Sequence, residues 1–104
     1  MPVSDRRNPF AEGHRATSLP LVSVIVRSLD RETLAQALDS LAAQTHPSME
    51  ILLVNAKGAN HRPLPALWGE RTVRFIDSSQ PVPRAAAANR GLDAARGDWL
   101  LFLD

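Results

Sequence analysis

Polar side chains directly follow each of four short apolar runs in this sequence. These polar stretches are residues 27–30, residues 55–58, residues 77–79 and the single residue Asp104. They include arginine, asparagine and aspartate, whose side chains hold polar ligands by charge or by paired hydrogen bonds. In parallel α/β sheets, ligands bind beyond the carboxyl ends of the strands. We therefore expect a functional site in this chain to be built from these four positions.

Several common kinds of chemical site are excluded. There is no cysteine, which rules out a disulfide framework, a thiolate metal site and a cysteine nucleophile. Neither Gly-x-Gly-x-x-Gly after the first apolar run nor Gly-x-x-x-x-Gly-Lys-Ser/Thr occurs, so two common nucleotide-binding motifs are missing. His14, His46 and His61 lack the spacing of metal ligands, and we interpret them as ordinary surface or loop residues.

The composition is that of one ordinary globular domain. Of 104 residues, 12 are Lys or Arg and 11 are Asp or Glu, giving a net charge of +1. A nucleic-acid partner is therefore not expected, because proteins that bind nucleic acids carry an excess of positive charge on one surface. No apolar run approaches the roughly 20 residues that span a bilayer. Residues 1–20 are polar and rich in proline, which predicts a flexible N-terminal arm before a folded body over residues 21–104.

Short apolar runs alternate with helical patterns in this body. Strands are predicted at residues 21–26, 51–54, 72–77 and 98–103 from their apolar content, because runs such as 21–26, apolar at nearly every position, suit strands covered on both faces. One helix is predicted after Asp30, its expected N-cap. A second is predicted from Pro83 to about Arg96, ended by Gly97 in the left-handed conformation. Residues 55–71 read as loop, with one helical turn near Leu67.

Strands that alternate with helices indicate an α/β fold with a Rossmann-like parallel sheet and flanking helices. The strand at 21–26 is expected in the interior of this sheet. The alanine run 85–88 and Gly91 predict a close contact between the second helix and the sheet. Trp68 and Trp99 are expected to be buried or half-buried.

Five short motifs together resemble the start of a known enzyme family. They are the strand and turn over residues 21–30, the stretch 37–41 with its exit 44–47, Asn89-Arg90-Gly91, Ala95-Arg96-Gly97, and Phe102-Leu103-Asp104. In this order and spacing they are similar to family 2 glycosyltransferases, which have the GT-A fold. The resemblance covers about residues 21–104, and it implies the nucleotide-sugar-binding N-terminal half of a GT-A domain.

The resemblance implies that the full-length protein transfers a sugar from a nucleotide-diphosphate donor to an acceptor, with inversion. Asp104 matches the start of the family's Asp-x-Asp motif, which implies that it binds the donor and a divalent metal, Mg or Mn. Further nucleotide-sugar-binding residues are expected at Arg27, Ser28, Asn55, Arg84 and Asn89. The catalytic base is expected outside these 104 residues, so the chain is interpreted as an N-terminal fragment that is inactive alone. A cytoplasmic location, including the inner membrane face, is expected because nucleotide sugars are made there.

The sequence also departs from the family pattern. Residues 27–30 are Arg-Ser-Leu-Asp instead of a Pro-Thr-Tyr-Asn-like turn. Asn55 and Ala56 replace an acidic pair whose second carboxylate often reads uracil, which implies a weaker preference for uridine. Ala88 stands where a basic residue often precedes the helix asparagine. Arg84 lies four positions earlier, on the same helix face, and is expected to serve the phosphates instead.

Other interpretations remain open from the sequence. Arg27 could pair with Asp30, Asn55 could be a turn former, and Arg84 and Asn89 could have only structural or solvent contacts. The whole chain could be a non-enzymatic flavodoxin-like binding module, or a receiver domain with Asp77 as its phosphoacceptor. A receiver also needs acidic residues after its first strand and a lysine on a fifth strand. The residues after the first strand are Arg27 to Asp30, with one acid among them.

Overall fold

The computed structural model describes residues 19–103. The elements run in the order β2 (Val22–Ser28), α1 (Leu34–Ala42), β3 (Met49–Asn55), β4 (Leu67–Trp68), β5 (Arg71–Ile76), α2 (Arg84–Ala94) and β6 (Trp99–Leu103). Of the expected N-terminal arm, residues 1–18 lie outside the described part, as does Asp104. The two helices, of 9 and 11 residues, are too short to cross a membrane, and this holds for every helix within residues 19–103.

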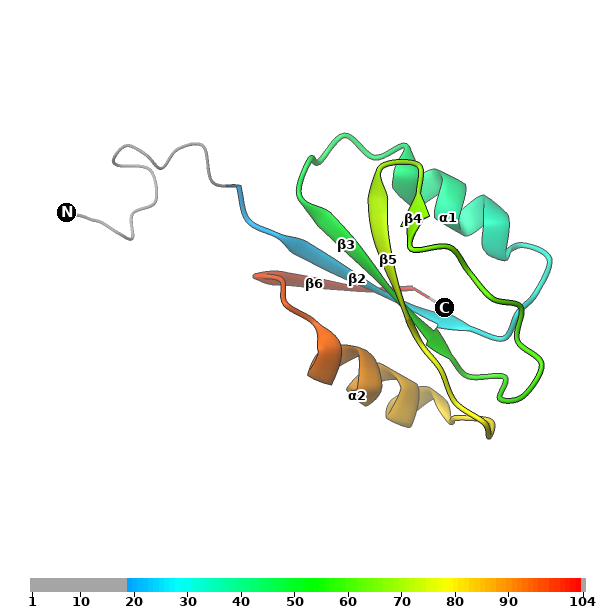
Figure 1. The fold of residues 1–104 in the computed structure, drawn as a ribbon. Helices are drawn as coiled ribbons and strands as arrows, with labels where there is room; N and C mark the ends of the chain where they lie inside the picture. Colours follow the sequence, from blue (N-terminus) through cyan, green and yellow to red (C-terminus); the bar gives the residue numbers. More distant parts are fainter. Residues whose placement is uncertain (1–18, 104) are drawn as a thin grey trace.

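The strands form one five-stranded sheet in the order β4-β5-β3-β2-β6 (Figure 1). β2 pairs in parallel with both β3 and β6, and β3 pairs in parallel with β5. Only the short β4 runs antiparallel, against β5. The expected parallel sheet with its first strand in the interior is therefore confirmed.

Each face of the sheet is covered by one helix, and each face has its own apolar core (Figure 1). Successive side chains of a strand point to opposite faces, so Val24 and Val26 pack with α1 while Ile25 packs with α2. α1 contributes Leu38, which is fully buried. Burial on both faces is why the central residues 24–26 of β2 and 51–54 of β3 are apolar at every position.

α2 approaches the sheet through small residues. Ala87 is 1% exposed, and a Cβ atom added to Gly91 would lie 2.3 Å from Cγ2 of Ile25. Real Cβ atoms do not come that close to a carbon. The close helix–sheet contact predicted from the alanine run and Gly91 is therefore confirmed.

Two predicted helix boundaries are wrong. Asp30 does not cap α1, because α1 begins at Leu34 with Thr33 at the N-cap position, and Asp30 itself has a left-handed backbone (φ 60°). Gly97 is not in the left-handed region. It is required instead by close approach, since a Cβ there would lie 2.5 Å from Oγ of Ser23 and 2.7 Å from the carbonyl oxygen of Leu21.

The sequence interpretation also missed two features of the strands. The segment near Leu67 is the short strand β4 and not a helical turn. β6 was expected to be buried, but it lies at the edge of the described sheet, and Trp99 is 64% exposed. Trp68, in contrast, is half-buried as expected, and its indole Nε1 donates a hydrogen bond to Asp39 at 2.8 Å.

Candidate functional site

The carboxyl ends of β2, β3 and β5 bring three of the polar stretches to one edge of the sheet. Ser28 is the register partner of Asn55. Val54 is the partner of Ile76, so Asp77 follows at the level of Asn55. The structure thus brings together side chains that are up to 49 positions apart in the sequence, as the parallel topology requires.

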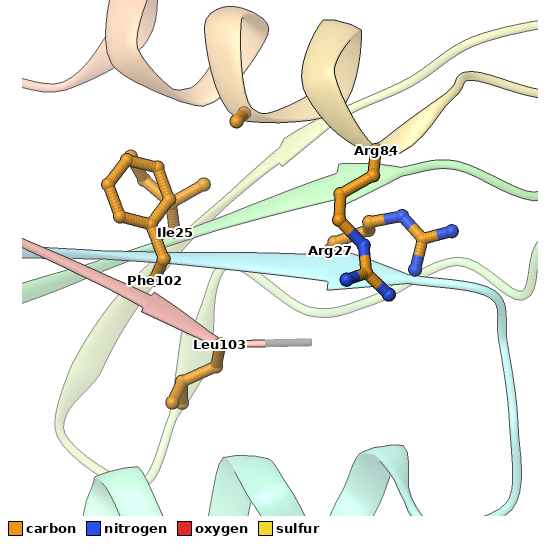
Figure 2. Close-up of a pocket in the computed structure, with 6 residues that line it drawn as sticks. Ile25, Arg27, Arg84, Phe102 and Leu103 are labelled. Carbon is orange, nitrogen blue, oxygen red and sulfur yellow. The ribbon is translucent and has the colours of Figure 1, made fainter.

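Arg27 and Arg84 line two cavities at this edge. The first has a volume of about 260 Å³ and lies on the α2 side, with Ile25, Ala88, Phe102 and Leu103 as its other lining residues. Figure 2 shows both arginine side chains at the carboxyl end of β2, and Phe102 of β6 beside Ile25. Arg27 is the second-last residue of β2, and Arg84 is the first residue of α2.

The second cavity has a volume of about 330 Å³ and is bounded by the start of α1 and the turn after β2. Its lining residues are Val26, Arg27, Ser28, Leu29, Arg31, Thr33, Leu34, Ala37 and Arg84. Arg27 and Arg84 belong to both cavities. They therefore form a shared cationic wall, and the positive end of the α2 dipole lies at the same place. Guanidinium groups in such a wall suit a phosphate or diphosphate ligand.

Asn55 is fully buried, and its amide is engaged by protein groups. Its Oδ1 accepts hydrogen bonds from the backbone N–H groups of Lys57 and Gly58, both at 2.9 Å. Its Nδ2 donates to the carbonyl oxygen of Gly58 and to Oδ1 of Asp77, both at 2.8 Å, and to the carbonyl oxygen of Ser78 at 3.3 Å. Asn55 therefore shapes the loop after β3 and ties it to the loop after β5, which is the turn-forming role left open above.

Ala56 points into the core and not toward the edge of the sheet. It is 2% exposed and packs in the apolar cluster on the α2 side with Val54, Val82 and Ala87. Its backbone is held at both ends, because its N–H donates to Ser28 O at 2.8 Å and its carbonyl accepts from Val82 N at 3.1 Å. A carboxylate at position 56 would be buried among apolar side chains.

Ser28 is hydrogen-bonded to His61, which was interpreted from the sequence as an ordinary surface or loop residue. Oγ of Ser28 lies 2.6 Å from Nε2 of His61, and Nδ1 of His61 lies 2.7 Å from the carbonyl oxygen of Arg62. A carbonyl only accepts, so we assign the proton of a neutral His61 ring to Nδ1, and the Ser28 hydroxyl then donates to Nε2. No spacing rule could have found this pair, because it depends on the course of the loop over residues 56–66.

Asp30 is the anchor of that loop. Its carboxylate accepts hydrogen bonds from the backbone N–H of Arg62 at 3.0 Å and from Nε of Arg62, and Nζ of Lys57 lies 3.5 Å from it. Burial raises the pKa of Asp30, but the hydrogen bonds from Arg62 and the charge of its guanidinium outweigh this and lower the pKa to about 2. Asp30 is thus paired with Arg62 and Lys57.

A third cavity, of about 410 Å³, opens between the loops after β3 and β5. Its lining residues are Gly58, Ala59, Asn60, His61, Asp77, Ser78 and Ser79. The hydrogen bonds from Asn55 and from the backbone of Ser78 lower the pKa of Asp77, against a smaller opposing effect of burial. The cavity therefore has an ionised carboxylate on one wall and an imidazole on another.

The remaining predicted residues have different placements. Asn89 is exposed on α2 and does not line these three cavities. Asp104, the predicted metal ligand, lies outside the described residues, although Leu103 before it lines the first cavity. Within residues 19–103 there is no group of three His, Asp or Glu side chains that could hold a metal.

Comparison with known proteins identifies the family. Residues 23–104 match the family described as glycosyl transferase family 2. A PGL/p-HBAD biosynthesis glycosyltransferase of Mycobacterium bovis is 39% identical over 92 residues, which cover 81% of this chain and 34% of that protein. The uncharacterized glycosyltransferase YwdF of Bacillus subtilis is 30% identical over 84 residues, covering 80% of this chain and 31% of that protein.

The putative glycosyltransferase EpsH, also of Bacillus subtilis, is 32% identical over 88 residues, covering 82% of this chain and 26% of that protein. The chain thus spans about a third of the length of the curated relatives that it matches. No solved structure matches it. The match over most of the chain, together with the parallel sheet and the motifs at its carboxyl edge, shows that this chain belongs to glycosyl transferase family 2.

Proposed function

We propose that the full-length protein transfers a sugar from a nucleotide-diphosphate donor to an acceptor with inversion, and that the edge of the sheet described above binds the donor. Family membership supports sugar transfer. The observation that carries the donor site is the shared wall of Arg27 and Arg84, which line both cavities at the carboxyl ends of the strands.

The two arginines are proposed to hold the diphosphate. A guanidinium stays charged at any working pH and offers paired N–H donors to phosphate oxygens. Arg84 is the first residue of α2, so the backbone dipole adds to its charge. Arg84 thereby takes the position of the basic residue that Ala88 does not supply, and Ala88 leaves room in the same cavity.

The other residues predicted from the sequence are proposed to have secondary roles in the donor site. Ser28 lies on the wall of the second cavity, where it contacts the donor directly or through His61. Asn55 supports the site by shaping the loop after β3. Asn89 is exposed on α2, so any contact that it makes with the donor is on that exposed face. Asp104 is proposed as the ligand of a divalent metal, and no catalytic step is derived through that metal. Because nucleotide sugars are cytoplasmic, the site is proposed to work on that side of the membrane.

Residues 1–104 alone are proposed to be inactive in transfer. The catalytic base is proposed to lie elsewhere in the full-length protein, because no carboxylate lines the two arginine cavities within residues 19–103. If the isolated chain transferred sugar from a nucleotide donor faster than buffer does, this part of the proposal would fail.

Calorimetric titration of the full-length protein with uridine, guanosine and thymidine diphosphates tests the donor site. Arg84→Gln and Arg27→Gln should each weaken binding of every diphosphate by about tenfold or more, since each removes charge-assisted hydrogen bonds. Arg90→Gln is the matched control, because Arg90 is exposed on the same helix and lines neither cavity. Equal affinities in all three variants and the unmodified protein would place the diphosphate elsewhere.

A further inference from the structure

The residues that would read the donor's base by family resemblance cannot do so here. Asn55 has both of its amide atoms engaged within the protein, and it is fully buried. Ala56 is buried in the apolar core on the α2 side. If a side chain of this edge reads the base, it must be another one.

We propose that Asp77 is that residue, and that its carboxylate accepts a ring N–H of the donor's nucleobase. This inference rests on the proposed donor site. Asp77 is exposed and lines the cavity of about 410 Å³. Its Oδ1 is fixed by Nδ2 of Asn55 and by the backbone N–H of Ser78, both at 2.8 Å. Within residues 19–103, its Oδ2 has no hydrogen-bond partner, so a held carboxylate presents one acceptor oxygen.

The position of Asp77 relative to the arginines suits a nucleotide. Asp77 follows β5, and β5 is separated from β2, which carries Arg27, by β3 alone. Two interstrand spacings amount to about 10 Å, which leaves room for a ribose between a base at Asp77 and a diphosphate at Arg27. The cavities also adjoin, because Ser28 lines the second, His61 lines the third, and these two side chains are hydrogen-bonded to each other.

The chemistry of a carboxylate selects among bases. An ionised carboxylate only accepts hydrogen bonds, and the Asn55 hydrogen bond keeps Asp77 ionised by lowering its pKa. Uracil and thymine have an N–H at ring position 3, and guanine has one at ring position 1. Cytosine and adenine have a lone pair at the corresponding ring nitrogen, which repels a carboxylate. Asp77 therefore favours uracil, thymine or guanine over cytosine or adenine.

Asp77→Asn reverses this preference with little change of shape. The Asn carbonyl oxygen can still accept from Asn55 and Ser78, while its NH₂ group replaces the free oxygen and donates to a ring lone pair. Calorimetric titrations of the full-length protein with uridine diphosphate and cytidine diphosphate compare two ligands with the same ribose and diphosphate. We expect the unmodified protein to bind uridine diphosphate at least about tenfold more tightly than cytidine diphosphate, as a hydrogen bond to a charged group implies. We expect the variant to bind cytidine diphosphate more tightly than uridine diphosphate.

Asp93→Asn is the matched control, since Asp93 is exposed near the end of α2 opposite to Arg84, and this variant should keep the original ratio.

The diphosphate of 3-methyluridine gives a test that needs no variant, because its methyl group replaces the hydrogen of the ring N–H. This ligand should bind at least about tenfold more weakly than uridine diphosphate. A flat ratio of uridine to cytidine diphosphate in the unmodified protein, or an unchanged ratio in Asp77→Asn, overturns the role of Asp77 while leaving the arginine site intact. Failure of every nucleoside diphosphate to bind the unmodified protein overturns the proposed donor site itself.

Discussion

The side-chain amide of Asn55 donates a hydrogen bond to the carboxylate of Asp77 across 2.8 Å, and it thereby joins the ends of two neighbouring strands. The same amide closes the turn over residues 55–58 through the backbone of Gly58. One buried polar side chain therefore fixes the position of two loops that border the third cavity.

Asn55→Ala should lower the free energy of unfolding by about 1–3 kcal/mol, because it leaves buried backbone donors and an acceptor without partners. Thermal or urea unfolding of the full-length protein measures the change. Asn89→Ala is the comparison, since Asn89 is exposed on α2 and its loss should change stability by less than about 0.5 kcal/mol. Equal stability of the two variants would mean that the turn does not need the amide.

Glu50, at the opposite end of the sheet, gives a prediction about pH. It is 7% exposed, and it accepts hydrogen bonds from Ser23 Oγ at 2.6 Å and from the backbone N–H of Arg96 at 2.8 Å. Burial raises its pKa, but the hydrogen bonds from Ser23 and Arg96 and the charge of Arg74 outweigh this and lower the pKa below the ordinary value of 4.5.

A lowered pKa in the folded state means that the Glu50 carboxylate stabilises the fold fully above pH 4.5 and that this contribution is lost as the pH falls through its folded-state pKa. Glu50→Gln should therefore be less stable than the unmodified protein at pH 7, by about 1–3 kcal/mol. The difference should shrink as the pH falls below 4.5. Urea unfolding at a series of pH values measures it, and a difference that is constant from pH 7 to pH 3 would contradict the assignment to Glu50.

Gly91→Ala should destabilise the protein by about 1–3 kcal/mol, because the new methyl group overlaps Ile25. This cost opposes the gain of about 1 kcal/mol that alanine has over glycine in a helix. A double-mutant cycle with Ile25→Ala separates the two effects, because removing the Ile25 side chain should relieve the clash and leave the helix gain. Additive effects in this cycle would show that the two positions are not in contact.

In the full-length protein, Asp104→Asn should lower metal-dependent turnover by about a hundredfold or more, as is usual when a charge is removed from a site that stabilises a transition state. Steady-state turnover at several Mg²⁺ and Mn²⁺ concentrations, with thermal unfolding as the control for folding, provides the measurement. Turnover that stays unchanged with its metal dependence intact would remove Asp104 from the site.

The central strands of the sheet could be predicted from the sequence because each strand is marked by a short run of neighbouring apolar residues. Runs such as Val24 to Val26 and Ile51 to Val54 are apolar at every position, and their shortness and branched side chains favour a strand buried on both faces. The close contact between α2 and the sheet at Gly91 could also be predicted, because glycine destabilises a helix interior and close packing is a reason for its presence there.

The errors concern contacts between segments far apart in the chain. Asp30 looked like a helix cap, but Arg62, 32 residues later, holds its carboxylate. Gly97 looked like a helix terminator, but the backbone of Leu21 and the side chain of Ser23 require it. The place of Asp77 at the carboxyl edge was expected, but its cavity is shared with His61, and no local pattern predicts that the loop after β3 brings His61 there.

The position of β2 between β3 and β6 has a consequence for how the chain is made. β3 ends at Asn55, but β6 ends at Leu103, about 50 residues later. At a synthesis rate of about 5–20 residues per second, one edge of β2 stays without its neighbour for roughly 2–10 seconds after the other edge can pair. An apolar strand with an unpaired edge is a template for other strands, so during this interval the exposed edge of β2 in the nascent chain can pair with strands of other chains.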